Sequence, residues 1–138
     1  MKIQFLICFI SLCFFTLSIH AQSFKGTWTG ESNGEVGTMS FDKKGYVAFI
    51  IDGEKVGGKE YIAEGVKLSM RYEYNEAIEP HTMDFIILMG EEELVRMLGI
   101  YKFIDKDTFI LNMDFEGKDR PLAFDEDDKN QVTLKKMK

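Results

Sequence analysis

Hydrophobic side chains in this chain recur at every second position, and this period constrains the fold more than any other feature of the sequence. In the segment 67–74 the apolar positions are Leu68, Met70, Tyr72 and Tyr74, with polar residues between them. The pattern returns at 83–87, 109–113 and 132–134. Because successive side chains of a strand point to opposite faces, one face enters a core and the other meets water. The sequence therefore predicts a succession of half-buried antiparallel strands.

Turn-forming dipeptides separate these alternating segments. Asn33-Gly34 and Asp52-Gly53 favour two-residue hairpin turns, because both positions tolerate a positive φ. We expect strands at 25–32, 36–42, 45–52, 55–63, 66–75, 81–89, 94–103, 107–115 and 130–137. A short piece at Pro121–Phe124 either adds to the eighth strand or covers an end of the structure.

Two acidic segments invite other interpretations. Glu91–Leu98 contains good helix formers, but Gly90 and Gly99 bracket it, and an isolated helix that short is marginal. We interpret it as a tight acidic turn that enters a strand. Asp125–Asn130 lacks the ligand spacing and central glycine of an EF-hand, so we interpret it as a solvated turn rather than a metal loop.

Eight or nine short antiparallel strands joined by hairpins, without helical crossovers, can form a closed up-and-down barrel or a sandwich. Closure removes exposed strand edges, which matters for a domain that no disulfide holds together. We therefore favour an all-β, antiparallel up-and-down β-barrel of about eight to nine strands.

The first 21 residues have the features of an export signal. Lys2 precedes the apolar stretch Phe5–Ile19, and Ala21 is a small residue suited to signal peptidase. We predict that residues 1–21 are removed and that residues 22–138 form one secreted or periplasmic domain. The alternative is an uncleaved membrane anchor, although a spanning helix usually needs about 20 apolar residues. Both cysteines, Cys8 and Cys13, lie in this segment, so the mature chain has no disulfide.

The mature chain is acidic. It keeps 16 of the 17 basic residues and all 23 acidic residues, which gives a net charge of −7 with histidine neutral. Such a charge repels phosphate backbones and anionic membrane surfaces. We expect no nucleic-acid partner and, after signal cleavage, no membrane partner.

The mature chain offers little for catalysis. His81 is its one histidine, and a Ser-His-Asp triad would need it beside Ser40 or Ser69, neither of which lies in a nucleophile motif. One histidine and no cysteine also disfavour a zinc site. The carboxylate runs are typical of solvated turns. We therefore predict no enzymatic activity, no catalytic residue and no metal or other cofactor.

Asp84 interrupts an otherwise apolar strand. An unpaired buried charge is costly, so we expect this carboxylate to face solvent or a partner. The candidate partners are Arg71, Arg96 and Arg120. A structural ion pair is the first interpretation, and an inward polar group that orients a ligand is the second.

Several blocks carry a family resemblance. Gly26-Thr27-Trp28 matches the G-x-W that opens the first strand of lipocalins, and the later blocks are Pro80–Phe85, Leu98–Phe103, Asp107–Phe109 and Arg120–Phe124. In this order they resemble a lipocalin-like, calycin-type family of short exported bacterial proteins, mostly without an assigned activity. The resemblance implies a barrel whose Trp28 plugs the closed end. Lipocalins commonly pack a terminal Arg over this Trp, and here Arg120 or Lys135 are the candidates to replace it.

Large aromatic and methionine side chains occupy many of the positions that can face inward, and methionine adapts to irregular apolar partners. A small barrel is just wide enough to be filled by its own side chains or to hold one small ligand. We predict a non-enzymatic protein that binds a small apolar or amphipathic ligand. The predicted ligand-binding residues are Trp28, Met70, Tyr72, Phe85 and Tyr101. The alternative is a solid barrel that contacts another exported protein through acidic loops at Glu91–Glu93 and Asp125–Asp128.

Overall fold

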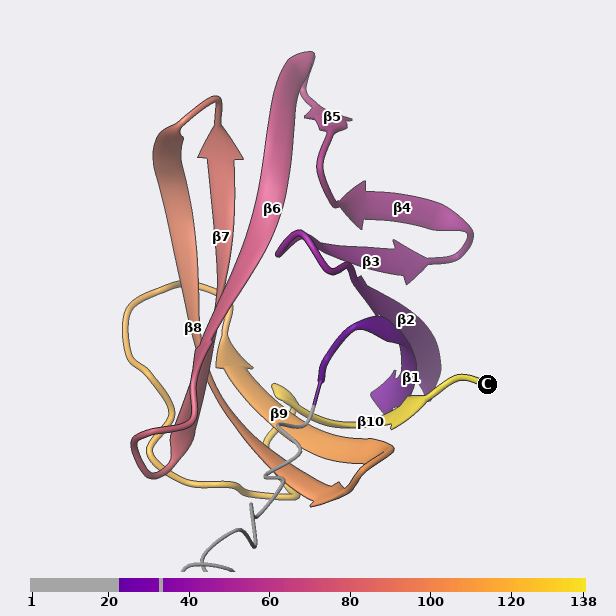
Figure 1. Ribbon diagram of the computed structural model, residues 1–138, viewed down its shortest axis with the longest axis vertical. Coiled ribbons are helices and arrows are strands. Elements are labelled where there is room, and N and C mark those ends of the chain that lie inside the picture. The colour runs from indigo at the N-terminus through magenta and orange to yellow at the C-terminus, as the bar shows by residue number, and fades with distance from the viewer. Residues whose placement is uncertain (1–22, 33) are drawn as a thin grey trace, which may run out of the picture.

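The computed structural model describes residues 23–32 and 34–138, and the predicted signal peptide lies outside these residues. These residues form ten strands, which wrap around one interior (Figure 1). They are β1 (Gly26–Ser32), β2 (Glu35–Phe41), β3 (Val47–Ile51), β4 (Glu54–Gly57), β5 (Tyr61–Ala63), β6 (Val66–Asn75), β7 (His81–Met89), β8 (Glu92–Asp105), β9 (Thr108–Asp114) and β10 (Gln131–Lys136).

The strands form an antiparallel, nearly closed barrel. Their spatial order is β4-β3-β2-β1-β10-β9-β8-β7-β6-β5, so chain neighbours pair with each other and β1 pairs with β10. The sheet meets itself where β3 and β4 approach β6, and the amide of Met70 on β6 donates to the carbonyl of Gly58, just after β4, at 2.9 Å. The prediction of an all-β up-and-down barrel is confirmed, and the barrel has ten strands where about eight to nine were predicted.

The prediction of one strand at 55–63 is wrong, because two glycines break this segment into β4 and β5. Gly57 and Gly58 adopt φ values of +107° and +83°, which a regular strand does not contain. The amide of Gly58 then donates to the carbonyl of Val47 at 2.7 Å. The chain therefore leaves the β3–β4 hairpin at this point and crosses toward β6.

The turn predictions agree with the structure where it describes them. Asp52 and Gly53 both have positive φ, 51° and 79°, as a two-residue hairpin turn of the primed type requires. Residues 92–98 belong to strand β8, so Glu91–Leu98 is no helix. Asp125–Asn130 forms turns in which the amide of Asp128 donates to the carbonyl of Asp125 at 3.1 Å.

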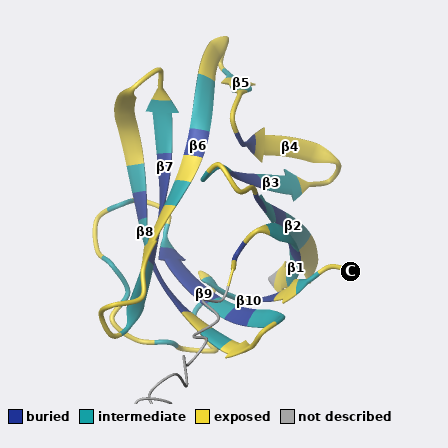
Figure 2. Cartoon of the chain, in the orientation of Figure 1, coloured by how far each residue is buried: buried dark blue, intermediate teal, exposed yellow. Residues whose placement is uncertain are grey.

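Aromatic side chains pack around Phe24 and Trp28 at one end of the barrel. Figure 2 shows that the buried positions lie on the strands around the interior. Trp28 is fully buried, and its indole Nε1–H donates to the carbonyl of Phe24 at 2.7 Å. The Phe24 ring is also buried, and its centroid lies within 6.5 Å of the centroids of six other aromatic rings. These rings belong to Phe41, Tyr72, Tyr74, Tyr101, Phe103 and Phe109. Phe24 and Trp28 together close this end, which we call the closed end.

The cation over Trp28 is Lys136, with its Nζ 5.6 Å from the ring centroid. Neither Arg120 nor Lys135 occupies this place. The reason is the register, which sets Lys136 directly opposite Trp28, whereas Lys135 falls on the other face of β10. Gly26 leaves room for it, because a Cβ at Gly26 would lie 3.1 Å from the Lys136 Cε.

Residues 115–130, between β9 and β10, cross the outer wall of the barrel, and we call them the outer strap (Figure 1). An Asn112 side-chain N–H on β9 donates to the carbonyl of Ala123 at 3.3 Å. Pro121–Phe124 therefore covers the side of the barrel. The expectation that it extends a strand or covers an end is wrong, because Arg120 and Asn112 hold the strap against the wall.

Candidate functional site

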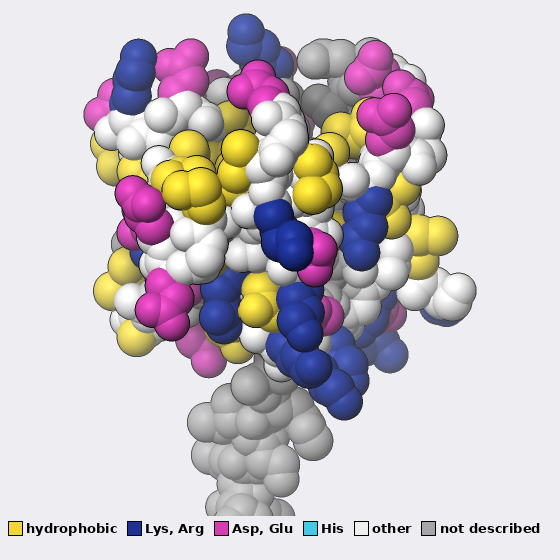
Figure 3. Space-filling view, turned by 90° about the horizontal axis from the view of Figure 1, so that it is seen from above, with side chains coloured by type: hydrophobic (Ala, Val, Ile, Leu, Met, Phe, Trp, Pro, Cys, Tyr) yellow, Lys and Arg dark blue, Asp and Glu magenta, His cyan; other side chains and the backbone are white. Residues whose placement is uncertain are grey.

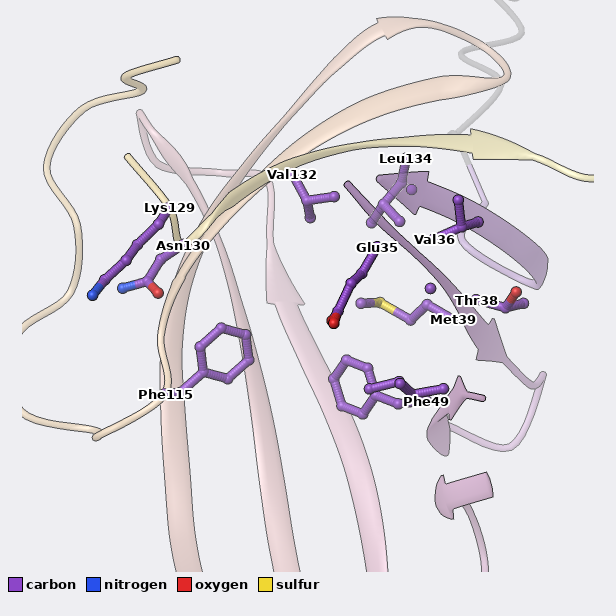
Figure 4. Close-up of a pocket in the computed structure, with 13 residues that line it drawn as sticks. Glu35, Val36, Thr38, Met39, Phe49, Phe115, Lys129, Asn130, Val132 and Leu134 are labelled. Atoms are coloured by element: carbon purple, nitrogen blue, oxygen red, sulfur yellow. The ribbon is translucent and has the colours of Figure 1, made fainter. Parts of the chain in front are cut away.

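A cavity of about 270 Å³ lies beyond the Trp28–Met39 pair, toward the turn of the β1–β2 hairpin, and we call this end of the barrel the open end. Figure 4 shows side chains from β2, β3 and β10 and from the outer strap around it. The lining residues are Gly30, Glu35, Val36, Gly37, Thr38, Met39, Phe49, Ile51, Phe115, Lys129, Asn130, Val132 and Leu134. Most of the wall is apolar, as in sites that bind small organic molecules.

Two glycines face each other beside the cavity, on the inner side of the β1–β2 hairpin. Gly30 and Gly37 are cross-strand partners in the register. A Cβ at Gly30 would lie only 2.7 Å from the Val132 Cγ2, so this glycine permits close packing of β10. A Cβ at Gly37 would meet no atom within 4 Å. The absent side chain of Gly37 is therefore what leaves the space unfilled.

Glu35 brings a carboxylate into this apolar site. It lies two residues before Gly37 on β2, so its side chain shares the inner face with Gly37 and Met39. In Figure 4 the carboxylate points between the rings of Phe49 and Phe115. Lys129 and Asn130, from the end of the outer strap, complete the rim, and the Lys129 side chain extends away from Glu35.

The five predicted ligand-binding residues lie in the packed core, and none of them lines the cavity. Trp28, Met70, Phe85 and Tyr101 are buried, and Tyr72 is half-buried. Phe85 packs against one of the lining residues, because its ring centroid lies 5.5 Å from that of Phe49. The structure brings the five together as neighbours in one hydrophobic cluster that supports the closed end.

Sequence reasoning missed Gly30, Glu35 and Gly37. The signal was present in the Asn33-Gly34 turn, because a two-residue turn at 33–34 sets the pairing of the flanking strands. That register places Gly30 opposite Gly37, as the structure has it. Two glycines that face each other inside a barrel contribute no side chains there, so they predict an unfilled space in the interior next to them.

His81 lies away from the serines that a triad would need. Its ring Nδ1 is 2.8 Å from the carbonyl oxygen of Ile78, and its Nε2 is 3.5 Å from the Glu79 carboxylate. Ser69 pairs with Leu88, seven residues beyond His81 on β7, which is about 23 Å along a strand. Ser40 lies on β2, which is not a neighbour of β7. Among residues 23–32 and 34–138, no three His, Cys, Asp or Glu side chains gather to hold a metal.

Asp84 forms the structural ion pair that we expected, with two of the three candidate arginines. Arg120 Nη1 lies 2.6 Å from its Oδ1, and Arg96 Nη1 lies 3.1 Å from its Oδ2. Burial would raise the pKa of Asp84, but hydrogen bonds and charge from the two arginines outweigh it and lower the pKa below its usual range. Arg71 instead lies over the Tyr46 ring.

Because Asp84 alternates with the inward-facing Met83 and Phe85, its carboxylate faces the outer wall and not the cavity. Arg120 belongs to the outer strap and also donates to the carbonyl of Gly99 on β8 at 2.8 Å. The ion pair therefore fastens the strap to the barrel.

No protein-family model, curated protein or solved structure matches this chain significantly. In the described part of the chain, no helix has the length and apolar character needed to cross a membrane. The interpretation of the site therefore depends on the geometry of its own residues.

Proposed function

We propose that this protein is an exported, non-enzymatic, lipocalin-like carrier that binds one small apolar or amphipathic molecule at the open end of its barrel. The cavity that Gly37 leaves open carries the proposal. Protein interiors are normally packed to the density of organic crystals. An apolar space of about 270 Å³ inside such a barrel is close to the lower size limit of small-molecule sites, about 300 Å³. Its occupant would be a compact molecule.

The first experiment is native mass spectrometry of purified residues 22–138, compared with the mass after denaturation. We expect a small molecule that is lost on denaturation, or, from an empty protein, binding of added 1-octanol in a calorimetric titration. The substitution Gly37→Val places a branched side chain in the cavity and should abolish binding. Ser40→Val, which adds bulk on the outer face of the same strand, should bind as the unmodified protein does.

Two results would contradict the proposal. One is unchanged binding by the Gly37→Val protein, which would place the ligand elsewhere. The other is a protein that carries no molecule and binds no 1-octanol.

The alternative, a solid module that contacts an exported protein through its acidic loops, has weaker support. Side chains in these loops bind the chain's own groups. Asp125 and Asp128 each accept a hydrogen bond from a backbone amide two residues ahead, at 3.0 and 2.9 Å, and Glu93 pairs with Arg96. Fewer carboxylates therefore remain to recognise a basic partner.

A further inference from the structure

We infer that the cavity takes an amphipathic amine, with the ammonium group at Glu35 and the apolar body against Met39 and Leu134. The inference rests on the proposed function and adds the chemical class of the ligand. Its starting point is the carboxylate that β2 places on the inner face of an otherwise apolar opening. A carboxylate accepts hydrogen bonds and attracts a cation, and charge-assisted hydrogen bonds are about twice as strong as neutral ones.

The two rings beside Glu35 favour the same charge. Phe49 and Phe115 both line the cavity, and the Glu35 carboxylate points between them (Figure 4). The face of an aromatic ring attracts an ammonium group within about 6 Å of its centroid. Phe115 is 49% exposed, so its ring is accessible to a molecule that enters the opening. One carboxylate and two phenyl rings together make a suitable site for an organic cation.

An anionic ligand is less well suited to the site. Lys129 is the cation on the rim, but its side chain extends away from Glu35 and out of the middle of the opening (Figure 4). A ligand carboxylate in the cavity would meet the Glu35 carboxylate, and like charges repel. The net charge of the mature chain, −7, would also slow the approach of an anion and speed that of a cation.

The outer surface carries charges of both signs. On the face that Figure 3 shows, exposed apolar side chains form a band across the middle, with acidic side chains toward the edges and lysines and arginines mostly below the band and in part along the upper edge. The preference for a cation therefore rests on Glu35 and the two rings, and not on this surface.

The test compares three molecules of equal chain length, octylamine, 1-octanol and octanoate, by calorimetric titration at pH 7. We expect the amine to bind about tenfold tighter than the alcohol, a difference of about 1.4 kcal/mol, and octanoate to bind most weakly. In Glu35→Gln the amine should lose this tenfold advantage while the affinity for the alcohol stays the same. Glu31→Gln, on the outer face of the same hairpin, is the matched control and should behave as the unmodified protein.

The outcomes separate this inference from the function on which it depends. If all three molecules bind equally and Gly37→Val abolishes binding, the inference is wrong and the carrier function stands. Tightest binding of octanoate would likewise overturn it. Amine binding that survives Gly37→Val would show attachment to the acidic surface and would also overturn it. If none of the three binds, both the inference and the proposed function fail.

Discussion

At the scale of single residues, Asp84 and Trp28 each depend on a partner that is distant in sequence. Arg120 reaches Asp84 from the outer strap, and Lys136 reaches Trp28 from the last strand. Both contacts join the C-terminal part of the chain to strands that come earlier in the sequence, β7 and β1. Each therefore stabilises the tertiary structure as well as the local structure.

The ion pair of Asp84 predicts a pH-dependent stability. Because folding lowers the pKa of this carboxyl group, its contribution is present above the unfolded pKa of about 3.9 and is lost as the pH falls toward the folded value. Asp84→Asn should cost about 2 kcal/mol in the free energy of unfolding at pH 7, and less at pH 3. Urea denaturation at both pH values measures this.

The control for Asp84 is Glu60→Gln, which removes an exposed carboxylate paired with Lys67 and should change the free energy of unfolding by less than about 0.5 kcal/mol. Equal losses for Asp84→Asn at pH 3 and pH 7 would show that lost packing, and not charge, explains the effect.

Lys136 predicts a measurable difference between two neighbouring lysines. Lys136→Met keeps most of the side-chain volume but removes the charge over Trp28, so it should lower the free energy of unfolding by about 1 kcal/mol and shift the tryptophan fluorescence. Lys135→Met, on the exposed outer face, should do neither. Identical effects of the two substitutions would contradict a cation–π contact.

At the scale of elements, the β1–β2 hairpin makes the open end different from the rest of the barrel. Its inner face carries Trp28 and Met39 at one level and the glycine pair at the next. The two glycines are opposite in the register but differ in their surroundings, since only Gly30 is packed against β10. This difference can be tested without any ligand.

Alanine at the two glycine positions should have opposite effects. Gly37→Ala places a methyl group in open space and removes a flexible residue from a strand, so we expect a gain of about 0.5–1 kcal/mol in the free energy of unfolding. Gly30→Ala forces a methyl group against Val132 and should cost about 1–3 kcal/mol. Thermal and urea unfolding of both proteins measure these values, and two losses of equal size would refute the packing argument.

The elements were more predictable from sequence than the site. Alternation and turn dipeptides predicted most strands, because the period of a strand is a local property. The break at Gly57-Gly58 was missed, since two glycines in an otherwise strand-like segment do not reveal whether their φ is positive. The cavity was missed for a different reason. Large side chains suggest a ligand site to a reader of the sequence, but in this barrel they pack against each other, and the space lies where side chains are absent.

At the scale of the whole molecule, the barrel has a packed closed end and an open end with a cavity. Phe24 lies at the centre of the aromatic cluster at the closed end, next to the predicted cleavage point. Trp28 and Phe109, whose ring centroids are 4.7 Å apart, lie in this cluster and do not line the cavity. Stability and binding should therefore depend on different ends of the molecule.

Phe24→Ala tests this separation. Loss of a buried ring from a packed cluster should lower the free energy of unfolding by about 3–5 kcal/mol. Below its lowered melting temperature, the variant should still bind 1-octanol with an affinity within about twofold of the unmodified protein, because the cavity wall is intact. Gly37→Val should show the reverse, a folded protein of equal or greater stability that binds nothing. If Phe24→Ala instead lost binding while still folded, the two ends would be coupled, and the packed cluster would have to be counted as part of the ligand site.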